Sequence, residues 1–145
     1  MITRKEYLDI YDVVGVALEV YNTLGRGMAE PIYQEAFEME LRRQGMDAER
    51  EKQLRLFYKE MLLEKTYYAD FYYKGIVVEL KAVDMIVSDH RAQLFNYMRI
   101  AHQTKGVLIN FGEKILRAEC YIFDKEKDRF ILLTQENYKH HILKE

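Results

Sequence analysis

The stretch YYADFYYKGIVVELKA, residues 67–82, decides the fold and raises the question of function. Two runs rich in β-branched and aromatic residues flank the pair Lys74-Gly75, a pattern typical of two strands joined by a tight turn. The stretch therefore predicts a β-hairpin. Charged residues nevertheless stand inside both strands, among residues that favour burial.

Three of those charges share one face of the expected hairpin. A two-residue turn, or a four-residue turn centred on the same pair, places Asp70 opposite Glu79 and Lys81 opposite Tyr68, whereas an odd-length loop would not. Because side chains alternate along a strand, the two acids and the lysine point to the same side. The opposite side is the better core face, and its residues are Ala69, Phe71, Tyr73, Ile76, Val78, Leu80 and Ala82.

Like charges directly opposite each other destabilise a strand pair, so the placement of Asp70 against Glu79 needs a reason. A divalent cation between the carboxylates would offset the repulsion, since hard cations such as Mg²⁺ bind carboxylate oxygens. Lys81 would then lie beside the ion and could stabilise negative charge or orient an attacking water. The alternative is a solvent-facing strand on which Lys81 neutralises two acids.

The periodicity of apolar residues predicts the other elements. Helices are expected over 4–24, with a stripe from Tyr7 to Tyr21 that includes Tyr11 and Leu18, over 31–44, and over 88–106, with Ser88 as N-cap and Gly106 past the end. Strands are expected over 53–59, 66–73, 76–83, 107–112, 118–123 and 129–134, and the tail 136–145 favours a short helix. The order α-α-β-β-β-α-β-β-β indicates an α/β (α+β) protein: residues 1–145 form one domain, a mixed β-sheet flanked by helices.

Composition bounds the function. The single cysteine, Cys120, excludes an internal disulfide and fits a reducing compartment and a small buried side chain. The charged N-terminus has no apolar signal region, so we expect a cytoplasmic protein. The formal net charge of the chain is −2, so it does not have the excess of basic residues that is usual in nucleic-acid-binding proteins. A local basic rim could still form from Arg42, Arg43, Arg91, Arg99 and Lys105.

The spacing D-(x)8-E-L-K of Asp70, Glu79, Leu80 and Lys81 resembles the signature of the PD-(D/E)XK nuclease superfamily. The order α-β-β-β-α-β resembles its restriction-endonuclease-like core, here with an extra N-terminal helix and C-terminal strands. Upstream, Gly27-x-x-Glu30-x-x-Tyr33 resembles the hallmark of the small bacterial GxxExxY proteins. Further matching segments, among them VVGVALEVYNTLG, AQLFNYMR and VLINFG, extend the resemblance from about residue 12 to 112.

The resemblance implies a metal-dependent nuclease that acts on nucleic acid, with DNA favoured over RNA. It implies that Asp70 and Glu79 bind Mg²⁺ or Mn²⁺ and that Lys81 is the catalytic lysine. Glu30 would supply a further metal or water contact, although an acid there could equally complement a helix N-terminus. Gln93 and Tyr97, one helical turn apart, would line the substrate side.

Other expectations stay open at this point. Tyr33 is a candidate substrate contact or core residue. Relatives often carry His at the position of Tyr21 and Arg at that of Tyr68, so phosphate contact is in doubt. The hairpin tyrosines could stack on bases or simply follow sheet propensity. A homodimer or partner protein is possible. The alternatives to a nuclease are a non-catalytic binding or assembly module with the same fold, and hydrolysis of a small phosphoester.

Overall fold

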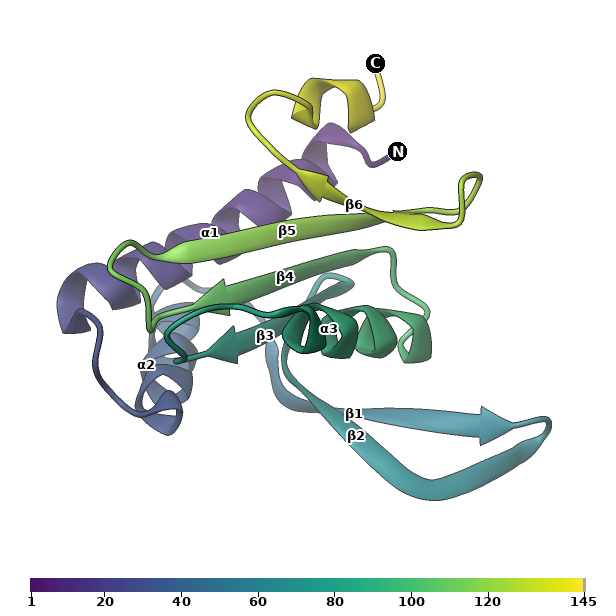
Figure 1. Ribbon diagram of the computed structural model, residues 1–145, viewed down its shortest axis with the longest axis horizontal. Coiled ribbons are helices and arrows are strands. Elements are labelled where there is room, and N and C mark those ends of the chain that lie inside the picture. The colour runs from purple at the N-terminus through teal and green to yellow at the C-terminus, as the bar shows by residue number, and fades with distance from the viewer. Residues whose placement is uncertain (145) are drawn as a thin grey trace.

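The computed structural model describes residues 1–144 and contains one six-stranded sheet with helices on both faces (Figure 1). The elements are α1 (Arg4–Leu24), α2 (Glu30–Arg43), β1 (Glu49–Tyr58), β2 (Met61–Tyr73), β3 (Ile76–Lys81), α3 (Ser88–Ile100), β4 (Lys105–Asn110), β5 (Arg117–Asp124), β6 (Arg129–Leu133) and the 3₁₀ helix η1 (Tyr138–His141). The predicted order of helices and strands is confirmed. Glu145, the last residue of the expected tail helix, lies outside the described residues.

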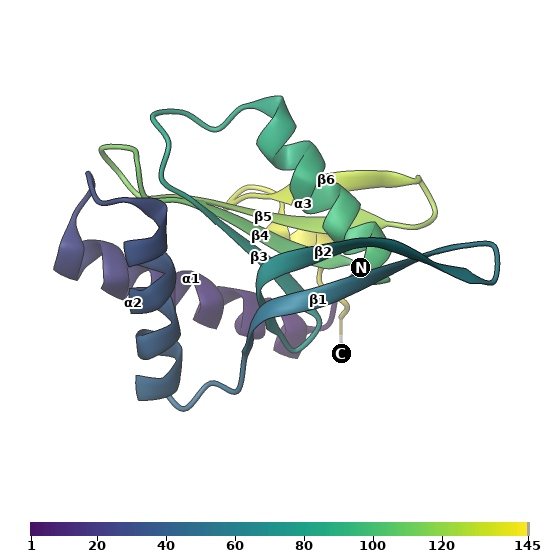
Figure 2. The same ribbon diagram turned by 90° about the horizontal axis from the view of Figure 1, so that it is seen from below.

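The sheet has the spatial order β1-β2-β3-β4-β5-β6. Only β3 and β4 are parallel, and α3 forms the crossover between them, as parallel neighbours require. Figure 2 shows α3 on one face of the sheet and α1 with α2 on the other. The fold is thus the mixed α+β arrangement of restriction-endonuclease-like domains. Within residues 1–144, none of the helices is both long and apolar enough to cross a bilayer.

Both faces of the sheet are buried, not only the one expected to be the better core face. Phe71, Val78 and Leu80 pack toward α1 and α2, while Val77 and Leu108 pack toward α3. Ala69 was expected beside Phe71 but belongs to the cluster under α3. The reason is that β2 pairs with β3 only over Phe71–Tyr73. The residues of β2 that precede Phe71 pair with β1 alone, and there the strand twists away from the plane of the sheet.

Helix α1 begins with a capping box in which Thr3 and Glu6 each accept the other's backbone N–H. It ends as predicted at Gly25, whose φ is 70°. The predicted apolar stripe is only partly correct, because Tyr11 and Leu18 are 63% and 46% exposed. The buried face is instead formed by Ile10, Val13, Val16, Ala17 and Val20. The helix carries two adjacent apolar stripes, and the one with small and β-branched side chains lies on the sheet.

Helix α3 begins one residue earlier than the expected N-cap implies and ends earlier than expected. Its N-cap is Val87 rather than Ser88, and Nδ1 of His90 accepts the Val87 N–H at 3.0 Å. The helix ends at Ile100, and Gly106 lies inside β4. A Cβ at Gly106 would be only 2.5 Å from Sδ of Met98, so glycine there allows α3 to pack closely on the sheet.

The β1–β2 hairpin projects from the body of the molecule, and we call residues 52–69 the arm (Figures 1 and 2). The predicted strands missed this extension, since they left 60–65 between them. The arm pairs with no strand other than its own two, because β2 and β3 separate beyond Phe71 and Val78. Five apolar residues at its tip are exposed: Phe57, Tyr58, Met61, Leu62 and Leu63.

Candidate active site

The predicted turn and register set up the site. Lys74 and Gly75 both have positive φ, 47° and 78°, the mark of a type I′ turn. Tyr73 pairs with Ile76, and the ladder continues to Phe71 and Val78, as the sequence predicted. There the two strands separate, and the charged residues follow at the point of separation.

Side chains replace the backbone ladder at that point. The N–H of Leu80 donates to Oδ2 of Asp70 at 2.8 Å, and the N–H of Asp70 donates to Oε2 of Glu79 at 2.8 Å. The two acids are therefore adjacent, as expected, but they are held by crossed side-chain bonds rather than by strand pairing. Lys81 does not face Tyr68, which was the expected pairing. Lys81 pairs with Asn110 of β4 and Tyr68 with Gln53 of β1, because β2 has turned away.

Burial makes the carboxyl groups of Asp70 and Glu79 harder to ionise, because it raises the pKa of each. Glu79 is only 3% exposed, so the alternative of a solvent-facing strand with neutralised acids is wrong. Burial, followed by the charge of Asp70, raises the pKa of Glu79 well above its ordinary 4.5. Burial also raises the pKa of Asp70, and the hydrogen bond from Leu80 opposes this only in part. The effect persists with Lys81 nearby, so the pair lacks a fully compensating positive charge.

Glu30 approaches the same pair from the first turn of α2. Nε2 of Gln34 donates to Oε2 of Glu30 at 3.3 Å and to Oδ1 of Asp70 at 3.4 Å, so the amide bridges the two acids. Burial and then the Asp70 charge raise the pKa of Glu30. Sequence reasoning missed Gln34, although its position one helical turn after Glu30 was a usable signal.

Lys81 is held from α3. Its Nζ donates to Oε1 of Gln93 at 2.8 Å, and Nε2 of Gln93 donates to the hydroxyl of Tyr97 at 3.2 Å. The structure thus brings together five of the predicted residues, Glu30, Asp70, Glu79, Lys81 and Gln93, with Tyr97 one hydrogen bond further on. Glutamine fixes the amine without adding a charge.

The Gly27-x-x-Glu30-x-x-Tyr33 spacing has a structural explanation. Gly27 has φ of 104°, which side-chain-bearing residues rarely adopt, and it lies in the loop between α1 and α2. The Tyr33 hydroxyl donates to the Gly25 carbonyl at 2.6 Å and accepts the Met28 N–H at 3.2 Å. Tyr33 is completely buried and stacks on Phe111, so its position does not support the expected substrate contact. It fixes the loop that leads into Glu30.

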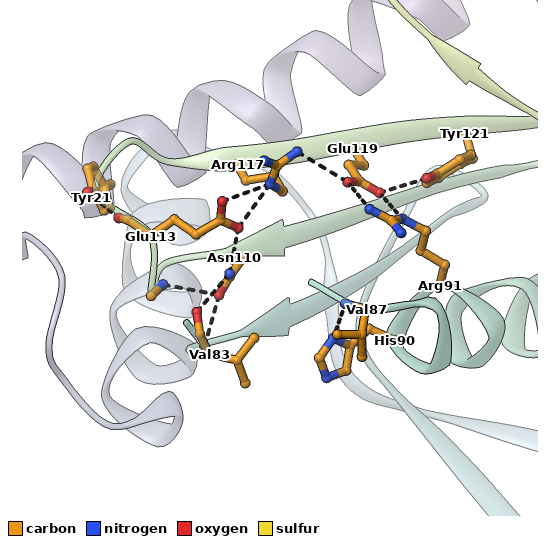
Figure 3. A network of polar contacts seen from close by, with 11 residues as sticks. Tyr21, Val83, Val87, His90, Arg91, Asn110, Glu113, Arg117, Glu119 and Tyr121 are labelled. Carbon is orange, nitrogen blue, oxygen red and sulfur yellow. Dashed lines mark hydrogen bonds and ion pairs between the residues drawn. The ribbon is translucent and has the colours of Figure 1, made fainter. Parts of the chain in front are cut away.

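A polar network that the sequence did not predict holds the segment after Lys81 (Figure 3). The Asn110 side chain accepts the Val83 N–H at 3.0 Å and donates to the Val83 carbonyl at 2.9 Å. Arg91, on α3, makes two hydrogen bonds of 2.8 and 2.9 Å to buried Glu119 of β5. These contacts fix both ends of the chain segment that connects Lys81 to Gln93.

The expected basic rim does not form as a free surface. Arg91 pairs with Glu119, and buried Lys105 pairs with Glu6 at 3.0 Å. Arg42 lies within 3.5 Å of Glu38. Lys105 begins β4 and pairs with Ile76 at the start of the parallel neighbour β3, whereas Glu79 and Lys81 lie at the other end of β3. Arg99 is exposed on α3 and lines the same groove as Gln93 and Tyr97.

Tyr21, where relatives often carry His, has a structural position. Its hydroxyl lies 2.7 Å from the carbonyl oxygens of Glu113 and Lys114, in the loop after β4. Tyr68, where relatives often carry Arg, is 54% exposed on the arm. Cys120 lies against the core as expected, and burial raises its thiol pKa to about 12.

The donor set fits a hard divalent cation. Asp70 and Glu79 each commit one oxygen to a backbone N–H; of the two remaining oxygens, Oδ1 of Asp70 accepts the 3.4 Å hydrogen bond from Gln34. Among residues 1–144, no group of three or more His, Cys, Asp and Glu side chains meets metal-ligand geometry. Two carboxylates nevertheless match Mg²⁺, which is commonly held by one or two carboxylates while it keeps waters and substrate oxygens.

Comparison with known proteins gives one family. The family model described as the PD-(D/E)XK nuclease superfamily matches residues 8–121, from α1 to β5. The matched region includes every site residue described above, and the chain belongs to this superfamily. Comparison with curated proteins and with solved structures gives no significant match.

Proposed function

We propose that the protein is a metal-dependent nuclease that hydrolyses phosphodiester bonds at the Asp70–Glu79–Lys81 site. The observation that carries the proposal is the crossed pair of carboxylates, buried Glu79 and half-buried Asp70, with an amine fixed beside it by Gln93. Such a pair raises the free energy of the folded protein when both acids are ionised, so selection for stability alone does not explain it. A role in binding a cation does.

Asp70 and Glu79 would hold the ion, and Glu30 would contribute through a water or through Gln34. A divalent cation at that position supplies Lewis acidity toward a phosphate and lowers the pKa of a nearby water. The Lys81 ammonium, oriented by Gln93, donates toward the attacking water or toward the negative charge that develops on phosphorus oxygens. The hydrogen bond to the Gln93 amide oxygen would keep the flexible amine in place without adding a charge.

The finer assignments rest on the resemblance stated above. They are Mg²⁺ or Mn²⁺ as the ion, DNA as the favoured polymer, the small bacterial GxxExxY proteins as the subfamily, cytoplasmic location, and a homodimer or partner protein. The role of Tyr33 in the Gly27-x-x-Glu30-x-x-Tyr33 loop supports the subfamily, because it explains why the glycine and the tyrosine accompany Glu30.

The first experiment measures metal binding without assuming a substrate. Wild type and Asp70→Asn are melted in chelator and across a titration of Mg²⁺ and Mn²⁺. At a hundredfold excess of metal over Kd, binding to the folded state contributes about 2.7 kcal/mol, which we expect for wild type only. In chelator, Asp70→Asn should melt at or above wild type, because one of two buried acids has lost its charge.

The opposite pattern would favour a non-catalytic module. If millimolar metal moves neither protein and Asp70→Asn is clearly less stable in chelator, Asp70 is a structural hydrogen-bond acceptor for Leu80 and nothing more. If metal binds, DNA and RNA cleavage is then tested with Lys81→Ala as the inactive control.

A further inference from the structure

A groove beside the candidate active site has chemistry that the metal site does not explain. It lies between α3 and the arm, with a cavity volume of about 540 Å³. Its walls include Tyr67 and Leu56 from the arm and Gln93, Asn96, Tyr97 and Arg99 from α3. Gln93 also holds Lys81, so the groove opens directly beside the proposed reacting centre.

We propose that this groove binds an unpaired nucleobase, and that the substrate is therefore single-stranded or locally unpaired nucleic acid. This inference rests on the proposed function and names its substrate class. The volume lies within the range of pockets that bind small organic ligands, about 300–1,000 Å³. It suits one base and its sugar rather than an extended polymer.

The groove offers an aromatic wall. The rings of Tyr67, from the arm, and Tyr97, from α3, are in tilted contact, with centroids 5.7 Å apart at an interplanar angle of 52°, and both line the groove; Tyr67 is the more exposed of the two. Stacking of a base on an aromatic side chain contributes about 1–3 kcal/mol and tolerates any base, because every base has a π-face. Tyr72 and Tyr73 are not among the residues that line this groove.

Polar groups converge on the same space. The Tyr97 hydroxyl accepts from Gln93, so its own proton remains to donate, and the Asn96 amide offers both a donor and an acceptor. Such groups match the edge of a base rather than a phosphate. The charged residues of the lining, Asp89 and Arg99, have opposite signs. A groove that grips phosphates would be lined by cations.

A duplex does not fit this arrangement. Its bases are stacked and paired inside the helix, and one must be extruded at a cost of a few kcal/mol before it can contact Tyr97. Leu56 and Tyr67 of the arm also line one side of the groove. An unpaired strand presents its bases without that cost.

The test measures binding in chelator, where no cleavage occurs. Fluorescence anisotropy follows four labelled oligonucleotides with wild type: a single strand, its blunt duplex, the duplex with one unpaired bulge, and an abasic strand of equal length. The single strand and the bulged duplex should bind at least about 10-fold more tightly than the blunt duplex and the abasic strand. Equal or tighter binding of the blunt duplex would overturn the proposal, as would equal binding of the abasic strand.

Variants place the binding in the groove. Ala92→Trp fills the groove from an exposed position on α3 and should weaken single-strand binding about 10-fold or more. Leu18→Trp, also exposed but on the opposite face of the sheet, is the matched control and should bind as wild type does. Asn96→Leu provides a milder second change if Ala92→Trp does not fold. If both groove variants bind as the control does, the base-pocket assignment fails.

Failure of the base-pocket proposal and failure of the nuclease proposal would give different results. Loss of metal-dependent cleavage with intact single-strand preference would sink the nuclease proposal and leave the groove as a binding site. Cleavage of duplex and single strand at equal rates, with no effect of Ala92→Trp, would leave the nuclease proposal and remove the base pocket.

Discussion

The backbone N–H of Asp70 donates to the Glu79 carboxylate at 2.8 Å, and each of these residues is the immediate neighbour of the last regular pair of β2 and β3, Phe71 and Val78. This bond means that the acids are placed by the backbone of the strands rather than by flexible side-chain packing. The carboxylates therefore cannot relieve their repulsion by turning apart without loss of a buried hydrogen bond.

Stability should fall with rising pH in the absence of metal. The pKa of Glu79 is raised in the folded state, so folding favours its protonated form. The resulting stabilisation is fully present below the ordinary pKa of 4.5 and is lost as pH rises through the raised value. Glu79→Gln should flatten this dependence and raise the melting temperature at neutral pH, by about 2–4 °C for each kcal/mol regained.

Melting in chelator between weakly acidic and neutral pH provides the measurement, and Glu35→Gln, an exposed acid on α2, is the matched control. Saturating Mg²⁺ should reduce the pH dependence of wild type, since the ion binds the ionised pair. A wild-type curve that rises over this pH range in chelator would contradict the assignment.

Lys81 and Gln93 should act as one unit in catalysis. Lys81→Ala should lower the single-turnover cleavage rate at saturating substrate by about 10²–10³-fold, the scale of a lost electrostatic donor. Gln93→Ala leaves the amine unoriented and should cost about 10-fold. Because Gln93 acts on this rate through Lys81, the double variant should be no slower than Lys81→Ala alone.

Full additivity of the two losses would show that Gln93 acts independently of the amine. Gln135→Ala, a change of the same type at an exposed position after β6, controls for nonspecific effects and should leave the rate unchanged.

Arg91 should be important for stability although it touches no site residue. Glu119 is 5% exposed and depends on two hydrogen bonds from Arg91, which hold its pKa below the usual range. Arg91→Ala leaves that carboxylate buried with poorer partners and should cost about 2–3 kcal/mol in the free energy of unfolding.

Urea denaturation measures this loss. Arg42→Ala removes a pair with Glu38 in which the arginine is 75% exposed, and it should cost no more than about 1 kcal/mol. Adding Glu119→Gln to Arg91→Ala should recover part of the loss, because the uncompensated charge is gone. Equal losses for the two arginines would contradict the role assigned to burial.

Two glycine substitutions should have opposite signs. A Cβ at Gly106 would meet Met98 and Leu94 at 2.5 and 3.1 Å, so Gly106→Ala should destabilise by about 1–3 kcal/mol as α3 is pushed off the sheet. Gly15, within α1, has open space within 4 Å of the same position. Gly15→Ala should therefore stabilise by about 0.5–1 kcal/mol through helix propensity. Chemical denaturation of the two variants side by side checks both signs.

The sequence predicted the parts of the site that depend on local geometry. A two-residue turn fixes the hairpin register, so the neighbours Asp70 and Glu79 followed from counting residues outward from Lys74-Gly75. Helical spacing placed Gln93 and Tyr97 on one side of α3. The order of elements followed because period 3.6 and period 2 alternate clearly along the chain.

Long-range features were out of reach. Because β2 separates from β3, Ala69 packs under α3 and not beside Phe71 as expected, and Lys81 pairs with Asn110 and not with Tyr68. No local sequence pattern indicates where a strand changes its pairing partner. The roles of Gln34 and Arg91 could not be predicted, because they depend on contacts with Asp70 and Glu119 that exist only in the folded protein. The basic rim failed for the same reason, since pairing of charges across elements is a property of the tertiary structure.

The arm has a further consequence for the kinetics of local opening. Its backbone hydrogen bonds are shared between two largely solvent-exposed strands, whereas those of β3 and β4 are covered on both faces. Amide protons of the arm should exchange with solvent much faster than those of the central strands, as expected for a separate low-stability unit. Asp70 lies at the boundary between the fast-exchanging arm and the slowly exchanging central strands, while Glu79 and Lys81 lie in the central strands. Fluctuations of the arm therefore change the position of one proposed cation ligand against a rigid second one.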